Sequence, residues 1–158
     1  MSYQGALQQA LRDLAAWVEK GVAPPASTNY RIENGQVIVA ATGAERRGIQ
    51  PVVRLRVKDG DRAVTAPGQR VHFSGTITVP PGAGSLVAAE WDFDGQGTFP
   101  TRATIAPGAT TATVASDHVF KKPGTYFPAL RGVSQRQGNR DTPYARVQNL
   151  GRVRIVVK

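Results

Sequence analysis

Two aspartates in one glycine-rich turn are the residues of this sequence most suited to chemistry. Asp92 and Asp94 stand in the run Trp91-Asp92-Phe93-Asp94-Gly95-Gln96-Gly97, and in extended backbone their carboxylates lie on the same side of the strand. Alternating oxygen ligands before a turn-forming glycine are typical of a calcium loop, although Ala103 stands at the twelfth position, where an EF-hand needs Glu. Asp117 would add a third oxygen if its strand lies beside the first. The alternatives are a calcium site at Asp92, Asp94 and Asp117, or a structural turn in which Asp92 and Asp94 cap backbone amides.

Catalysis by the chain itself lacks a complete set of groups. The sequence has no cysteine and no Gly-x-Ser-x-Gly nucleophile turn, and its two histidines are His72 and His118. His72 falls on the polar side of an alternating strand, where a histidine is usually just exposed. No third acid-base group is placed near Asp92 and Asp94. We therefore expect no enzyme activity from this chain.

Positive charge gathers in the last quarter of the chain. The net charge is +9, and residues 119–158 hold nine basic side chains against the single acid Asp141. One interpretation is a solvated basic face that keeps the protein soluble. The other is a binding surface for an acidic polymer or glycan, with Tyr144 as an aromatic contact and with the basic residues Lys121, Lys122, Arg131, Arg136, Arg140 and Arg146. Nucleic acid is less favoured as a partner, because few aromatic side chains are placed for stacking on bases.

The elements that position these residues begin with one helix. Apolar residues recur at three and four positions from Gly5 to Lys20, which predicts an amphipathic helix that Gly21 ends. Its apolar stripe consists of Leu7, Leu11, Leu14 and Val18. The sandwich, a second copy of the chain or an upstream domain must cover this stripe.

Everything after the helix has the pattern of strands and turns. Asn34-Gly35 joins two short apolar runs, 30–33 and 36–39, and predicts a β-hairpin. Later runs alternate apolar and polar residues between Pro- and Gly-rich turns, which predicts half-buried antiparallel strands. The polar, Arg-rich segment 132–149 is expected to be an excursion between the last two strands. The predicted fold class is mainly β, an antiparallel β-sandwich preceded by one amphipathic α-helix and a β-hairpin.

Two motifs resemble the PKD domain family. One is His118-Val119-Phe120-Lys121-Lys122-Pro123-Gly124-Thr125-Tyr126, close to the family segment H-x-Y-x-x-P-G-x-Y. The other is the turn at Asp92, in which Asp94-Gly95 stands where the family has Gly-Asp. The resemblance covers residues 59–158 and implies an Ig-like sandwich that serves as a non-catalytic module of a larger extracellular protein. It also implies a structural role for His118, which would hold the turn by hydrogen bonding across the sandwich.

The first third of the chain carries a second resemblance. The run Leu14-Ala15-Ala16-Trp17-Val18-Glu19-Lys20-Gly21-Val22-Ala23-Pro24-Pro25-Ala26-Ser27 is similar to an element near the end of a group of bacterial α/β-hydrolase-type esterase-like proteins. The match covers residues 7–55. It implies that residues 1–58 are the tail of an upstream hydrolase-like domain, to which the PKD-like sandwich of residues 59–158 is attached. The upstream domain of the parent polypeptide is then an expected partner.

Together these features predict a non-catalytic accessory, spacer or protein-interaction module of a larger extracytoplasmic protein, whether secreted, periplasmic or on the cell surface. One alternative is a binding module for acidic polymers or glycans, with an acidic polysaccharide or another protein as its partner. Another is a completing part of an α/β-hydrolase-type esterase. No apolar run approaches the roughly 20 residues of a membrane span, and no signal peptide is evident. No cofactor is expected beyond the calcium alternative.

Overall fold

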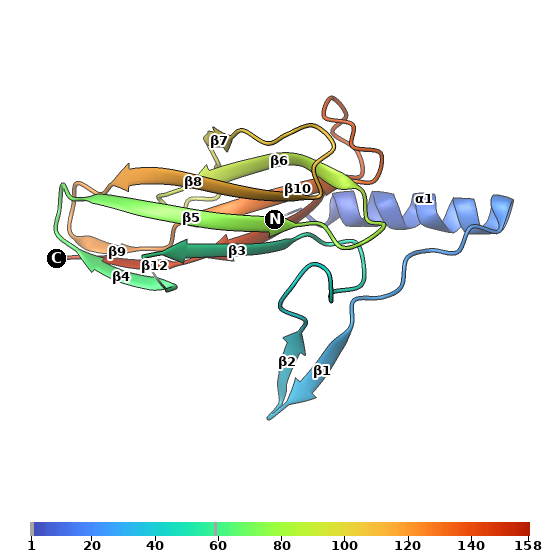
Figure 1. Ribbon diagram of the computed structural model, residues 1–158, viewed down its shortest axis with the longest axis horizontal. Coiled ribbons are helices and arrows are strands. Elements are labelled where there is room, and N and C mark those ends of the chain that lie inside the picture. Colours follow the sequence, from blue (N-terminus) through green and yellow to red (C-terminus); the bar gives the residue numbers. More distant parts are fainter. Residues whose placement is uncertain (1, 59) are drawn as a thin grey trace.

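Alternating side chains place the strands in two facing sheets, as the computed structural model shows for residues 2–58 and 60–158 (Figure 1). In β5, for example, Val71, Phe73 and Ile77 are buried while His72 is exposed. The chain is thus mainly β, with one helix at its start. The elements are α1 (Gln4–Lys20), β1 (Tyr30–Glu33), β2 (Gln36–Val39), β3 (Val52–Val57), β4 (Arg62–Thr65), β5 (Arg70–Thr78), β6 (Ser85–Asp92), β7 (Thr101–Ala103), β8 (Thr111–Val119), β9 (Gly124–Tyr126), β10 (Ala129–Gln135), β11 (Val147–Arg152) and β12 (Arg154–Val157).

The two layers of the sandwich are built from three sets of paired strands. One layer has the order β3-β5-β8, and the facing layer has the order β11-β10-β6-β7. A third set, β4-β12-β9, continues the second layer, since β9 leads into β10 and β11 leads into β12. All pairings are antiparallel except that of β4 with β12, which is parallel. The predicted antiparallel sandwich is confirmed, with this one parallel edge pairing added.

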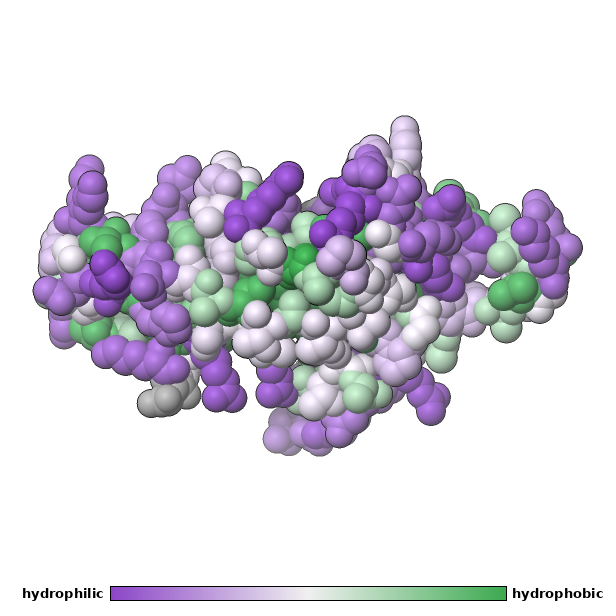
Figure 2. All heavy atoms as spheres, turned by 45° about the horizontal axis from the view of Figure 1, so that its top comes forward, coloured by the Kyte–Doolittle hydropathy of each residue, from purple (hydrophilic) through white to green (hydrophobic). Residues whose placement is uncertain are grey.

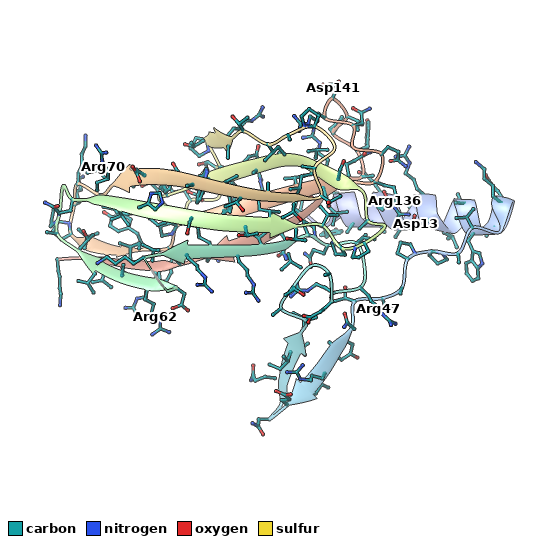
Figure 3. All side chains as sticks on the ribbon, in the orientation of Figure 1. Asp13, Arg47, Arg62, Arg70, Arg136 and Asp141 are labelled. Atoms are coloured by element: carbon teal, nitrogen blue, oxygen red, sulfur yellow. The ribbon has the colours of Figure 1, made fainter. Side chains whose placement is uncertain are left out.

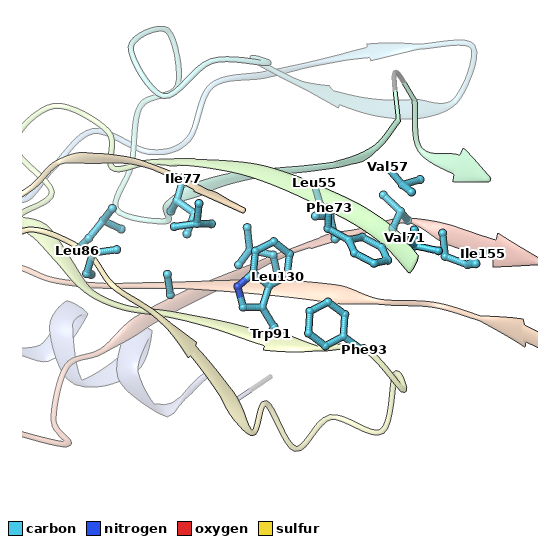
Figure 4. Close-up of a cluster of buried hydrophobic side chains, with 14 of the residues drawn as sticks. Leu55, Val57, Val71, Phe73, Ile77, Leu86, Trp91, Phe93, Leu130 and Ile155 are labelled. Carbon is cyan, nitrogen blue, oxygen red and sulfur yellow. The ribbon is translucent and has the colours of Figure 1, made fainter. Parts of the chain in front are cut away.

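Large aromatic and aliphatic side chains fill the space between the layers (Figure 4). Trp91 and Phe73, from opposite layers, are 1% and 0% exposed. Phe93 links them, with ring centroids 5.6 Å from Trp91 and 5.4 Å from Phe73. Aromatic pairs in this geometry add to the stabilisation from burial alone.

Two glycines let the layers approach closely. A Cβ atom on Gly75 of β5 would lie 2.3 Å from Leu130 Cδ2, and one on Gly132 of β10 would lie 2.6 Å from Ile77 Cγ2. Any larger residue at either position would push the sheets apart. The sandwich therefore closes its own core and leaves little apolar surface for other elements.

Helix α1 packs on the sandwich with its polar face. Its buried residues are Gly5 and Gln9, and a Cβ atom on Gly5 would lie only 1.8 Å from the Arg146 carbonyl oxygen. Farther along, Arg136 Nη2 donates to Asp13 Oδ2 at 3.2 Å, and Figure 3 shows these two side chains together at the base of the helix. Gly21 ends the helix in the left-handed conformation, as predicted.

The apolar stripe of α1 faces away from the sandwich. Each of its four residues is at least half exposed: Leu7 52%, Leu11 58%, Leu14 50% and Val18 77%. In Figure 2, apolar side chains lie at the surface of the end where the helix projects beyond the sheets. Of the three covers expected for this stripe, the sandwich is therefore excluded for the described residues.

The predicted hairpin is confirmed, and it also projects from the sandwich. Asn34 and Gly35 both have positive φ, 50° and 74°, as a two-residue hairpin turn requires. Tyr30 pairs with Val39 and Ile32 with Val37, so these four apolar side chains share one face of the ribbon. Three of them are at least 64% exposed.

Two expectations about the chain's organisation change in the structure. The excursion expected at 132–149 is only 136–146, because residues on both sides of it continue the ladder of β10 with β11. Buried Val133 and Ser134 belong to that ladder, and buried Gln135 pairs with Ser85 of β6. In addition, β3 pairs with β5 over six residue pairs, so the sandwich includes residues on both sides of the division predicted at 58/59.

Candidate functional site

The acidic turn after β6 is organised by one carboxylate. Asp92 is 3% exposed, and its Oδ1 accepts hydrogen bonds from the backbone amides of Gly95 at 2.9 Å and Gln96 at 3.2 Å. Its Oδ2 accepts a third bond from the Gly97 amide. The Asp92 carboxylate therefore caps the turn, which is the structural role weighed as one alternative for it.

The other two predicted calcium ligands lie elsewhere. Asp94 is exposed in the turn. Asp117 points outward from β8, where its Oδ1 lies 2.7 Å from His72 Nδ1 and its Oδ2 lies 3.9 Å from Arg70 Nη1. Within residues 2–58 and 60–158, no three acidic or histidine side chains gather closely enough to hold a metal ion.

His118 joins the two sequence motifs by stacking. Its ring lies 4.5 Å from Phe93 at an interplanar angle of 9°, and 4.6 Å from Phe120 in an edge-on arrangement. Burial lowers the pKa of His118, while the charge of Asp94 raises it in part. Because the folded state favours the neutral ring, the stability that this ring contributes is present above its unfolded pKa and falls as the pH drops below that value. No hydrogen bond from this ring to another described residue is seen, so stacking is the contact that ties the motifs together.

The calcium site and the structural turn are two alternatives that thermal unfolding can distinguish. We expect no rise in melting temperature with millimolar Ca²⁺, since three amides already occupy the Asp92 carboxylate and the chain carries a charge of +9. A rise that Asp94→Asn abolishes would contradict this expectation and support the calcium alternative.

Arg131, one of the residues predicted to bind polyanions, is held within the sheet. Its Nε and Nη2 donate to Glu90 Oε2 at 2.8 and 2.6 Å, and its guanidinium lies 4.1 Å from the ring centroid of Phe99. Glu90 is 7% exposed, and Arg102 Nε approaches its other oxygen at 3.5 Å. A buried carboxylate needs such partners, so the main role of Arg131 is to pair with Glu90 within the fold.

The arginines around the 136–146 segment are also engaged internally. Arg140 Nη2 donates to the carbonyl oxygens of Ile105 and Ala106 at 3.1 and 2.9 Å. Arg146 donates to the carbonyls of Thr142 and Arg140, and Arg136 contacts Asp13 as described. Of the predicted basic set, Lys121 and Lys122 are exposed in the turn after β8. The structure thus does not gather the six basic residues into one free surface patch.

Two hollows beside α1 were not expected from the sequence. One, of about 490 Å³, lies between the helix and the 136–146 segment, with Tyr144 on its wall. The other, of about 450 Å³, lies between Leu14, Trp17 and the Pro24-Pro25 turn. Sequence periodicity could not indicate them, because each joins residues that are far apart along the chain or lie in irregular backbone.

The strand order and the core define the class of this protein, a mainly antiparallel β-sandwich of two facing layers. A scan against protein-family models gave no match, and neither did a search of curated proteins. Among solved structures, the chain is similar to the PKD domain of an M14-like peptidase from Thermoplasmatales archaeon SCGC AB-540-F20, at 18% identity and a TM-score of 0.43 over 68% of this chain and 92% of that one.

Two further solved structures are similar. The CARDB domain of the PF1109 protein from Pyrococcus furiosus, in complex with di-metal ions, has 13% identity and a TM-score of 0.44 over 70% of this chain and 96% of that one. A superoxide reductase from Ignicoccus hospitalis has 16% identity and a TM-score of 0.35 over 66% and 80%. A PKD domain is thus among the structural neighbours, whereas the resemblance to a hydrolase tail stays a prediction. The assignment to the sandwich class rests on the observed strand order and core.

Proposed function

We propose that this chain is a non-catalytic interaction module that joins a neighbouring folded domain of the same polypeptide through residues 3–39. The observation that carries the proposal is the orientation of α1, which turns its polar face to the sandwich and its apolar stripe to solvent. Monomeric soluble proteins rarely leave such a stripe uncovered. The occupant is a preceding domain, because the helix and its Pro-Pro turn are similar to an element that packs on an α/β-hydrolase body.

The hairpin supports the same interface. An isolated two-stranded ribbon is marginally stable in water, and this one exposes Tyr30, Ile32 and Val37 on a single face. A partner that covers this face would stabilise the ribbon. Helix and hairpin follow each other in the chain, so one domain can contact both.

A recess beside the helix adds a concave part to the proposed interface. The hollow of about 450 Å³ has a mostly apolar lining that includes Leu14, Trp17, Pro24 and Pro25, together with the polar residues Asp13, Ser27 and Thr28. Trp17 is 55% exposed there. Large aromatic side chains in concave surroundings are the residues that contribute most to protein interfaces.

The proposal is tested with the triple variant Leu7→Gln, Leu14→Gln and Val18→Gln. For the chain alone, we expect wild type to bind a hydrophobic dye such as ANS and the variant to bind it much less, with the same melting temperature, since exposed side chains contribute little to stability. In a chain that also contains the preceding domain, the wild type should no longer bind the dye. In the triple variant, the sandwich and the preceding domain should no longer pack against each other. Val64→Gln, at an exposed valine of β4 (53%), is the control and should change neither result.

Three outcomes would contradict the proposal. A dye-free monomer of the isolated wild-type chain would show that the stripe needs no partner. A lower melting temperature of the triple variant alone would show that the sandwich covers the stripe. A stable dimer in sedimentation, abolished by the triple variant, would make a second copy the occupant.

The extracytoplasmic location predicted from the PKD resemblance is part of this proposal. Its support is the resemblance itself, since PKD-like modules commonly belong to extracellular proteins. Among the described residues, no helix has the length and apolar character needed to cross a membrane.

A further inference from the structure

We propose that the hollow between α1 and the 136–146 segment binds a carboxylate-bearing sugar, such as a uronate unit of an acidic polysaccharide. The hollow has a volume of about 490 Å³, and its wall includes Gln8, Arg12, Gln137, Asn139 and Tyr144. In Figure 1 the segment that forms its outer wall rises beside the helix. This site shares only Leu11 with the apolar stripe of α1 and no residue with the hairpin, so it is distinct from the proposed docking interface.

The carbonyl oxygens of the side-chain amides in this wall are already used. Gln8 Oε1 accepts from the backbone amide of Ala145 at 2.8 Å, and Asn139 Oδ1 accepts from the amides of Asp141 and Thr142 at 2.8 and 3.3 Å. Because a backbone N–H can only donate, these bonds establish which side-chain atom is oxygen.

The same reasoning orients Gln137 through its neighbour. Gln135 Oε1 accepts from the backbone amides of Gln137 and Asn139, so Gln135 Nε2 must be the donor to Gln137 Oε1, at 3.1 Å. The oxygen of Gln137 thereby accepts one hydrogen bond from within the protein as well.

The polar groups of the wall that have no partner are hydrogen-bond donors. Within residues 2–58 and 60–158, the NH₂ groups of Gln8, Gln137 and Asn139 make no hydrogen bond, and Arg12 makes no salt bridge. The acid of the segment, Asp141, lines a different hollow with Arg140 and Arg146. These four donor groups have no partner within the protein, whereas each amide oxygen beside them already accepts at least one hydrogen bond, which suits a ligand that is rich in acceptors and negatively charged.

The remaining surface of the hollow favours a sugar over a bare anion. Tyr144 is 63% exposed, and Leu11 and Ala145 also line the wall. A volume of about 490 Å³ exceeds the space that a phosphate fills and is within the range of small-molecule sites. An aromatic ring beside convergent amide donors can contact the apolar C–H face of a sugar ring while the amides bind its oxygens.

The test uses the full chain, a galacturonate oligosaccharide, the methyl-esterified form of the same oligosaccharide, and inorganic phosphate. Binding is followed by ¹H–¹⁵N NMR, in which side-chain NH₂ groups give their own signals. We expect the free acid to shift the signals of Gln8, Gln137 and Asn139, with the ester and phosphate binding at least about tenfold more weakly.

Isosteric variants make the test specific. Gln137→Glu and Asn139→Asp each keep the oxygen that serves the fold and replace the free NH₂ by a charged oxygen. Each should weaken binding of the free acid by about tenfold or more, since a donor to the ligand becomes a like charge. Gln69→Glu makes the same chemical change at an exposed position in the turn between β4 and β5, and this turn lies at the end of the sandwich opposite α1 (Figure 1). It should change binding by less than about twofold.

Four outcomes would each overturn the proposal or a part of it. Equal losses from Gln137→Glu and Gln69→Glu would show nonspecific attraction to the basic chain and overturn the proposal. Equal binding of the methyl ester would overturn the need for a carboxylate, and equal binding of phosphate would overturn the sugar. No signal shift at millimolar oligosaccharide would also overturn it, and none of these outcomes bears on the docking interface.

Discussion

Trp91→Ala is expected to lower the free energy of unfolding by about 3–5 kcal/mol, a large part of what holds a domain of this size together. Trp91 is 1% exposed and stacks on Phe93, so its removal opens a cavity between the two layers that the glycine contacts keep from collapsing. Chemical denaturation followed by circular dichroism measures the change.

Trp17→Ala is the matched control, because it removes the same side chain from an exposed position. Trp17 is 55% exposed on α1, and we expect a loss of less than about 0.5 kcal/mol in the isolated chain. Similar losses from both substitutions would contradict the placement of Trp91 in the sandwich core and of Trp17 on the surface.

Asp92→Ala is expected to cost about 2–4 kcal/mol, since three backbone amides of the turn lose their common acceptor. Solvent reaches part of the turn, so the loss is smaller than three separate buried hydrogen bonds would give. Asp92→Asn retains one oxygen and should lie between wild type and Asp92→Ala. Denaturation midpoints at constant slope provide the measurement.

Asp94→Ala is the control two residues away in the same motif. The Asp94 side chain is exposed, so we expect a change within about 0.5 kcal/mol. Should Asp94→Ala destabilise the chain as much as Asp92→Ala, the turn would depend on both carboxylates, and a bound cation would become the better explanation.

Local sequence patterns were sufficient for most of the secondary structure. The helix ended at Gly21 and the hairpin turned at Asn34-Gly35 as predicted, because these positions need backbone conformations that few residues adopt. Alternation assigned the buried face of β5 correctly, since strand periodicity is a local property, whereas in β6 residues on both faces are buried. The length of the β10–β11 ladder was underestimated, because polar Ser134 is buried between partner strands that the local pattern does not reveal.

The candidate sites depended on contacts between distant segments. Asp92 and Asp94 looked equivalent in the sequence, but only Asp92 lies where three amides converge on it. The arginines looked like a free basic surface, whereas Arg131, Arg136 and Arg140 pair with Glu90, Asp13 and backbone carbonyls. Which charges are paired is set by packing across the fold, and composition carries no information about it.

The orientation of α1 shows where sequence information ends. Periodicity established that the helix has one apolar and one polar face, because side-chain spacing follows from helix geometry alone. Which face meets the sandwich depended on the surface that the sandwich offers. That surface has Arg136 and the Arg146 carbonyl for Asp13 and Gly5, and the core behind it is already closed by its own strands. The polar face therefore docks on the sandwich, and the apolar face is left exposed.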